Sequence, residues 1–120
     1  MNNTVEIGNF GEVEAEKYLI SKGYEILEKK FRYQSAEIDI IAKQNNELVF
    51  IEVKTRKTNY FGEPEEFVTK AKQKLIIKAA NAFICNNNLD NESRFDIISI
   101  LYNSKTYKIN HIESAYFAMM

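Results

Sequence analysis

The chain has 120 residues and a mass of 14.0 kDa, the size of one small domain, and we expect residues 1–120 to form a single domain. Hydrophobic residues make up 45% of the chain and charged residues 28%, a balance that excludes a disordered or fibrous protein. The single cysteine excludes an intramolecular disulfide, and the single histidine excludes a centre built from several histidines. Because no apolar segment is long enough to span a membrane and the first residues do not resemble a signal peptide, we expect a cytoplasmic protein.

Charge is distributed unevenly along the chain. Sixteen basic and seventeen acidic residues leave a net charge of −1, which argues against a general basic coat for nucleic acid. Residues 1–28 hold six acidic and two basic side chains, whereas residues 54–78 hold seven basic and three acidic ones. The basic segment indicates either a phosphate-facing surface or a solvated helix face.

The first half of the chain predicts one helix and three strands. Helical spacing of Val13, Ala15, Tyr18, Leu19 and Ile20 predicts a helix from Asn9 to Ser21, which Gly23 ends. Apolar and β-branched residues then predict strands over Tyr24–Phe31, Ala36–Lys43 and Glu47–Thr55. The polar turns between these strands are short, which favours an antiparallel meander.

The second half predicts one more helix and two more strands. After a loop at Tyr60–Pro64, a long helix is expected from Thr69 to Asn86, with Thr69 as its N-cap. Its core face holds Ile76, Ala79, Ala80 and Phe83, and Lys70, Lys74 and Lys78 share another face. Strands over Arg94–Leu101 and Thr106–His111 and a short apolar tail complete the chain. This order predicts an α/β fold with a mixed sheet flanked by helices.

Charged residues interrupt two of the predicted strands. In the third strand, Glu52 and Lys54 follow Leu48 and Phe50 on one face, and the opposite face is also apolar, which indicates a central strand covered on both sides. In the second strand, Glu37 and Asp39 are expected on one face, opposite Ile38 and Ile40. If the two strands pair as a hairpin, Asp39 lies beside Glu52.

A carboxylate on each of two adjacent strands can bind a hard divalent cation. Mg²⁺ suits such a site, because it takes six oxygen ligands at about 2.0–2.1 Å and commonly keeps several waters. Lys54 can orient an attacking water and stabilise charge on a phosphate. The pattern of Asp39 followed by Glu52-x-Lys54 is typical of a large class of metal-dependent nucleases. A cross-strand ion pair is the simpler alternative.

Other polar residues are expected near this pair. Glu12 lies in helical register with Ala15 and Leu19, so it points toward the protein and can add a metal ligand, directly or through water; a favourable interaction with the helix dipole also explains it. Lys72 and Gln73 open the second helix, where a phosphate can sit, although a lysine that extends its amine from the apolar face to solvent is the commoner explanation of Lys72. The remaining candidates for contact with a nucleic-acid backbone include Arg56 and Arg32.

Several short segments occur in an order that resembles the YraN-like family of small bacterial proteins. They are Gly11-Glu12, Gly23-Tyr24, residues 36–42 with Glu37-Ile38-Asp39, residues 49–56 with Glu52-Val53-Lys54, Arg94-Phe95-Asp96 and His111-Ile112-Glu113. The resemblance covers about Gly8 to Phe117 and implies a restriction-endonuclease-like fold, similar to that of Holliday-junction resolvases. By motif, it implies that Glu12, Asp39, Glu52 and Lys54 form the metal site. The family usually has glycine where this chain has Ala36, a change that leaves every proposed ligand in place.

These observations lead to three functional hypotheses. The first is a Mg²⁺- or Mn²⁺-dependent endonuclease acting on DNA, including branched DNA, with the Val53 carbonyl as a further ligand. The second is a non-catalytic nucleic-acid-binding module that keeps the nuclease fold. The third is a structural partner protein whose charged residues form an ion-pair network. Because symmetric cutting needs two sites, a homodimer is also expected. The apolar tail from Ala115 to Met120 either forms part of its interface or covers the chain's own sheet.

Overall fold

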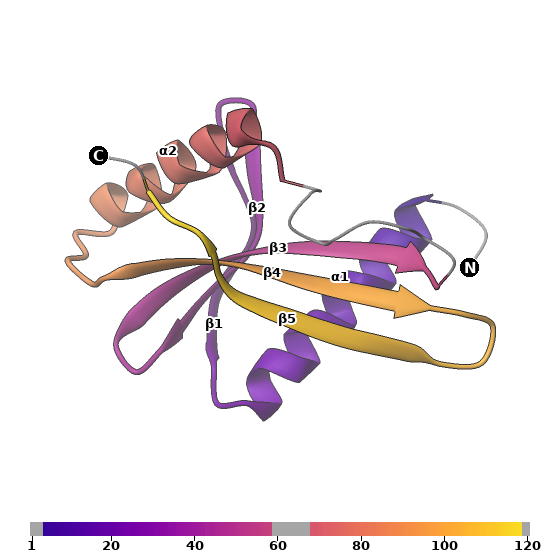
Figure 1. The fold of residues 1–120 in the computed structure, drawn as a ribbon. Helices are drawn as coiled ribbons and strands as arrows, with labels where there is room; N and C mark the ends of the chain where they lie inside the picture. Colours follow the sequence, from indigo (N-terminus) through magenta and orange to yellow (C-terminus); the bar gives the residue numbers. More distant parts are fainter. Residues whose placement is uncertain (1–3, 59–67, 119–120) are drawn as a thin grey trace.

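The computed structural model describes residues 4–58 and 68–118, which form a five-stranded sheet with one helix on each face (Figure 1). The elements are α1 (Thr4–Ser21), β1 (Glu25–Tyr33), β2 (Ala36–Gln44), β3 (Glu47–Lys57), α2 (Lys70–Asn86), β4 (Ser93–Tyr102) and β5 (Tyr107–Tyr116). The strands lie in the order β1-β2-β3-β4-β5. All neighbours are antiparallel except β3 and β4, which are parallel because the chain crosses over through α2 between them. The predicted α/β class and mixed sheet are confirmed, and the arrangement is consistent with a restriction-endonuclease-like fold.

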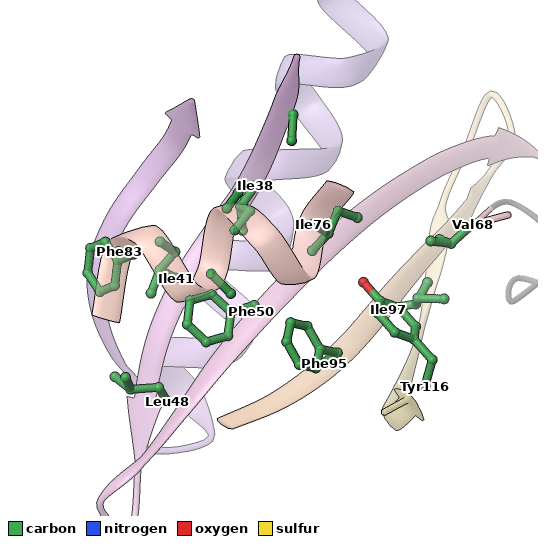
Figure 2. Packing of buried hydrophobic residues seen from close by; sticks show 13 residues of the cluster. Ile38, Ile41, Leu48, Phe50, Val68, Ile76, Phe83, Phe95, Ile97 and Tyr116 are labelled. Carbon is green, nitrogen blue, oxygen red and sulfur yellow. The ribbon is translucent and has the colours of Figure 1, made fainter. Parts of the chain in front are cut away.

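Two hydrophobic clusters cover the two faces of the sheet. Alternate residues of β3 enter different clusters: Phe50 packs beneath α2, and Ile51 packs beneath α1. The cluster beneath α2 includes the predicted helix stripe of Ile76, Ala79, Ala80 and Phe83. Figure 2 shows Ile76 and Phe83 of this helix close to Ile41 and Phe50 of the sheet. Because β3 is apolar on both faces, it is a central strand, as the sequence predicts.

α1 packs unusually close to β3 at one point. A Cβ atom placed on Gly11 would lie 1.8 Å from Oγ1 of Thr55, so only glycine allows this approach. The helix begins at Thr4 rather than at the predicted Asn9, because it continues through Gly8. The predicted apolar face is wrong at two positions, since Val13 is 49% exposed and Ile20 is 55% exposed.

The ends of the strands agree with the predictions to within two residues, except at β5. This strand was expected to end at His111 but continues to Tyr116, which pairs with Phe95 of β4 and is buried. The pairing of β5 with β4 shifts register between Phe95 and Ile97, and Ser114 of β5 has a positive φ of 51°. This irregularity accommodates the polar residues of β5, and the strand continues beyond them. Tyr116 therefore covers the chain's own sheet, and the expected exposed tail is reduced to residues after it.

The remaining predictions on chain organisation have mixed outcomes. Thr69 is the N-cap of α2, as expected, and its Oγ1 accepts a hydrogen bond from the backbone N–H of Lys72 at 3.2 Å. The predicted loop at Tyr60–Pro64 lies outside the described residues. Within residues 4–58 and 68–118, neither helix combines the length and apolar character needed to cross a membrane.

Candidate functional site

The site is built on the second half of β3, where the strand changes from apolar to charged. Glu52 is buried, and Lys54 is half-buried two residues further along the same face. That face lies under α2, because Leu48 and Phe50 of the same alternating set belong to the cluster beneath this helix. The predicted placement of Glu52 and Lys54 on one face of a central strand is confirmed.

Asp39 reaches the site through an irregularity in β2. Ile38 packs in the cluster beneath α2, whereas Ile40 packs in the cluster beneath α1, so strict alternation breaks at Asp39. The predicted arrangement, with Glu37 and Asp39 on one face opposite both isoleucines, is therefore wrong. Opposite this point in β1, Lys30 has a positive φ of 54°, which marks a matching distortion of the neighbouring strand.

The irregularity places the Asp39 carboxylate against β3. The paired register of β2 and β3 ends at Ile40 and Ile51. Just beyond it, the backbone N–H of Val53 donates to Oδ2 of Asp39 at 2.7 Å. A side-chain carboxylate thus takes the place of a main-chain acceptor, which satisfies the N–H and fixes Asp39 beside Glu52.

Two lysines hold one oxygen of the Glu52 carboxylate. Lys72 Nζ of α2 lies 2.7 Å from Oε1, and Lys54 Nζ lies 3.2 Å from the same atom. The other oxygen, Oε2, is buried and has no hydrogen-bond partner among the described residues. An unsatisfied buried acceptor costs about 1–3 kcal/mol, and more when it belongs to a charged group.

Burial and neighbouring charges shift the pKa values of three groups at the site. Burial, and then the charge of Glu52, raise the pKa of Asp39 to about 7, although the Val53 hydrogen bond lowers it. Burial lowers the pKa of Lys54, and the neighbouring Lys72 lowers it further, against the effect of Glu52. Burial also acts to lower the pKa of Lys72, but its hydrogen bond to Glu52 and the charge of Glu52, with smaller contributions from Lys54 and Asp39, together raise it.

These groups fit a hard divalent cation. Two carboxylates meet at the site, one carboxylate oxygen lacks a partner, and all the available donors are oxygens, which Mg²⁺ and Mn²⁺ prefer. Among the described residues, no three His, Cys, Asp or Glu side chains lie together as a ready-made metal cage. Asp39 and Glu52 would therefore be the carboxylate ligands, and waters would complete the shell, as is usual for Mg²⁺.

Glu12 lies near this pair but does not join it in a three-carboxylate group. It is half-buried on α1, on the sheet face opposite α2. Burial raises its pKa, Lys30 lowers it, and the charges of Glu37 and Glu52 raise it further, so the carboxylates affect one another across the sheet. A role for Glu12 through a bridging water stays a prediction.

The four residues predicted to contact nucleic acid occupy different places. Lys72 joins the site through Glu52, and Gln73 Nε2 donates to the Val68 carbonyl at 3.1 Å beside the helix start. Arg56 continues β3 beyond Lys54, and its Nη1 donates to the Thr55 carbonyl at 2.9 Å. Arg32 lies apart on β1, exposed, and pairs with Glu37 at 2.9 Å.

A second polar cluster, around Asp96 of β4, has no counterpart among the predicted site residues. The Asp96 side chain is fully buried, and its oxygens accept hydrogen bonds from Arg94, from the Ser114 backbone N–H and from His111 Nε2, the last at 2.7 Å. Arg94 also donates to the Tyr24 hydroxyl at 2.6 Å. A charged residue inside the apolar run of β4 was the available signal, since such a group is buried only with partners.

The model of an uncharacterised protein family, UPF0102, matches residues 11–100, a range that includes Glu12, Asp39, Glu52 and Lys54. The chain belongs to the UPF0102 family. The resemblance to the YraN-like family is thereby confirmed.

UPF0102 proteins of several bacteria are similar to this chain over nearly its whole length. The Flavobacterium psychrophilum protein is 47% identical over 112 residues, which cover 93% of this chain and 94% of that protein. The Clostridioides difficile protein is 49% identical over 117 residues, which cover 97% of this chain and all of that protein. The Christiangramia forsetii protein is 49% identical over 112 residues, which cover 93% of this chain and 94% of that protein.

Proposed function

We propose that this UPF0102 protein is a Mg²⁺- or Mn²⁺-dependent endonuclease that hydrolyses DNA phosphodiester bonds, with branched or otherwise structured DNA as its substrate. The observation that carries the proposal is the buried pair of Asp39 and Glu52, with Glu52 Oε2 unpartnered and Lys54 Nζ 3.2 Å from Oε1. A nuclease of this kind would act in the cytoplasm, as the sequence analysis expects.

Each residue has a definable task in such a reaction. Asp39 and Glu52 would hold the ion, and the Val53 carbonyl is available as a further oxygen ligand. When bound, the ion would supply Lewis-acid polarisation of a phosphate oxygen and a more acidic water. Lys54 would position the attacking water and stabilise charge on the phosphate, and its lowered pKa makes its proton easier to move. Lys72 would keep Glu52 oriented, because it holds Oε1 at 2.7 Å.

The test is cleavage of linear duplex and four-way-junction DNA with Mg²⁺, with Mn²⁺ and with chelator. Lys54→Ala is expected to abolish metal-dependent cleavage and to leave DNA affinity nearly unchanged, because one lysine contributes little to an interface with many phosphates. Lys57→Ala is the matched control: Lys57 ends the same strand but is exposed, so its loss should leave cleavage intact. Cleavage that survives Lys54→Ala contradicts the assigned role.

A second function has a specific observation in its favour. Lys54 and Lys72 already balance the charge of Glu52, so the same residues can serve as an ion-pair network in a non-catalytic nucleic-acid-binding module. A wild-type protein that binds DNA but cuts no tested form with either metal would favour this module over the nuclease.

The homodimer remains part of the nuclease proposal. Two active sites related by a two-fold axis would cut both strands of a symmetric junction. The apolar tail contributes less to the expected interface than the sequence indicates, because Tyr116 is buried on its own sheet. Sedimentation at micromolar concentration, with and without junction DNA, tests it, and a strict monomer in both conditions contradicts the junction-cutting form.

A further inference from the structure

A groove runs along the flank of α2, beside the helix face that packs on the sheet, and its walls include Ile77, which is partly buried against the core. It has a volume of about 800 Å³, and its walls include Lys70, Lys74 and Lys78 of the helix and Phe117, which follows β5. Figure 1 shows the end of β5 rising to the side of α2, so that the last described residues flank the helix. The groove therefore combines a column of positive charges with an aromatic ring from a distant part of the chain.

The stability of α2 does not account for its lysines. The helix has four lysines and no acidic residue, and two of the lysines, Lys70 and Lys72, stand in its first turn. The helix dipole favours acidic side chains there and disfavours cations. Among the described residues, no ion pair reaches Lys70, Lys74 or Lys78. The placement of these charges is therefore unfavourable for the isolated helix and favourable for binding an anion.

The lysine spacing suits a polyanion better than a small anion. Residues four apart on a helix are neighbours on one face and are separated by a rise of about 6 Å. This step is comparable with the separation of consecutive phosphates along one nucleic-acid strand. Lys70, Lys74 and Lys78 therefore offer one cation to each of three successive phosphates.

Phe117 indicates which form of nucleic acid the groove accepts. Its side chain is 72% exposed, although most other large apolar side chains of the chain are buried. An exposed aromatic ring beside a row of cations is the arrangement on which proteins bind single strands, since unpaired bases stack on the ring while the backbone follows the charges. In an intact duplex, the faces of the bases are already stacked on one another.

We propose that the groove along α2 binds an unpaired segment of nucleic acid, with phosphates on the lysine column and a base on Phe117. This inference rests on the proposed nuclease function and names its substrate class, which is DNA with a single-stranded segment such as a flap or a branch. The groove lies next to the proposed catalytic site. Gln73 lines the groove, and it directly follows Lys72, the lysine that contacts Glu52.

The test measures binding by the full chain in chelator, so that its outcome does not depend on cleavage. Fluorescence anisotropy compares a labelled oligothymidylate of roughly 12 nucleotides, within the range of known single-strand sites, with a duplex of equal length. Phe117→Ala should weaken single-strand binding about tenfold and leave duplex binding unchanged, whereas Phe117→Trp should keep single-strand affinity.

The lysine column has its own matched control. Lys74→Gln with Lys78→Gln should reduce the slope of log affinity against log salt by about 1.4 for the single strand. Lys105→Gln with Lys108→Gln removes the same charge from the turn before β5 and the start of that strand, outside the groove, and should leave the slope unchanged. All four lysines are exposed, so the variants should fold, which unfolding curves will verify.

Two results would overturn this inference. One is single-strand affinity that does not change in Phe117→Ala, and the other is an equal salt slope in the two double variants. If either occurs while Mg²⁺-dependent cleavage is observed, the groove assignment fails and the nuclease stands. If the variants behave as expected but no DNA form is cut, the groove stands and the nuclease fails.

Discussion

Gly11→Ala is expected to destabilise the protein, although alanine is the better helix former. The added methyl would lie 1.8 Å from Thr55 Oγ1 and 3.1 Å from Thr55 Cβ. Rotating the threonine side chain leaves its Cβ 3.1 Å from the added methyl, and one of the two rotations brings the threonine methyl into the same space. Because both residues are buried, α1 or β3 must move. Overpacking of this kind costs about 1–3 kcal/mol. The helix-propensity gain of about 1 kcal/mol offsets part of it, which leaves a net loss of up to roughly 2 kcal/mol.

Gly8→Ala is the matched control on the same helix. No atom lies within 4 Å of a Cβ built on Gly8, so this substitution should stabilise the protein by roughly 0.5–1 kcal/mol. The assay is urea unfolding followed by circular dichroism, with the free energy of unfolding as the readout. Opposite signs for the two substitutions are the expected result.

A double-mutant cycle isolates the contact itself. Thr55→Ala removes Oγ1 and the methyl, so Gly11→Ala should cost much less in that background, with a coupling of about 1 kcal/mol or more. Because Thr55 directly follows Lys54, Gly11→Ala alone should also impair metal-dependent cleavage. If Gly11→Ala stabilises the protein as much as Gly8→Ala does, the close approach of α1 to β3 is refuted.

Two further predictions concern the metal and the Asp96 cluster. Mg²⁺ or Mn²⁺ should raise the melting temperature of the wild type, because it binds the folded state, and Asp39→Asn with Glu52→Gln should remove the effect; an equal shift in the double variant would exclude these ligands. Asp96→Asn should cost about 3 kcal/mol or more at neutral pH, because it leaves Arg94 and His111 without their buried partner. Burial acts to raise the Asp96 pKa, but the bonds from His111, Arg94 and Ser114 lower it overall. A lowered carboxyl pKa contributes stability above the unfolded pKa of about 3.9 that is lost as pH falls through the folded value. The difference in the free energy of unfolding between wild type and Asp96→Asn, measured by urea unfolding, should therefore decrease below about pH 4. A difference that does not change with pH would contradict the charge-based explanation.

The sequence pattern predicts those parts of the molecule that depend on local periodicity. Strand alternation places Glu52 and Lys54 on one face, and helical spacing identifies Ile76 and Phe83 as core residues. The pattern predicts correctly that Asp39 lies beside Glu52, but it predicts a regular alternation in β2 that breaks at Asp39. Its position depends on where β2 and β3 stop pairing, a property of two strands and the helices packed on them rather than of either strand alone.

Contacts between distant segments account for the rest. Lys72 was expected to point toward a phosphate, but its contact with Glu52 depends on how α2 crosses the sheet. The Asp96 cluster joins β4, β5 and the residue before β1, and the residues that satisfy it, Tyr24 and His111 among them, are ordinary in their own segments. Val13 and Ile20 match helical spacing but are exposed. Helical spacing predicts which side of a helix faces the core, but it does not predict how much of the helix circumference the core covers.

The distortions in the outer strands bear on how copies of this protein meet in solution. β1 and β5 are the two edges of the sheet, and an open edge can accept a strand from another molecule. β1 is shifted in register between Ile26 and Glu28, twisted at Lys30 and rich in exposed charges, while the pairing of β5 shifts beside Phe95. Such edges resist continuous intermolecular sheets. A functional pair of subunits should therefore associate through side chains, and the unassembled protein should remain resistant to amyloid-like polymerisation at high concentration.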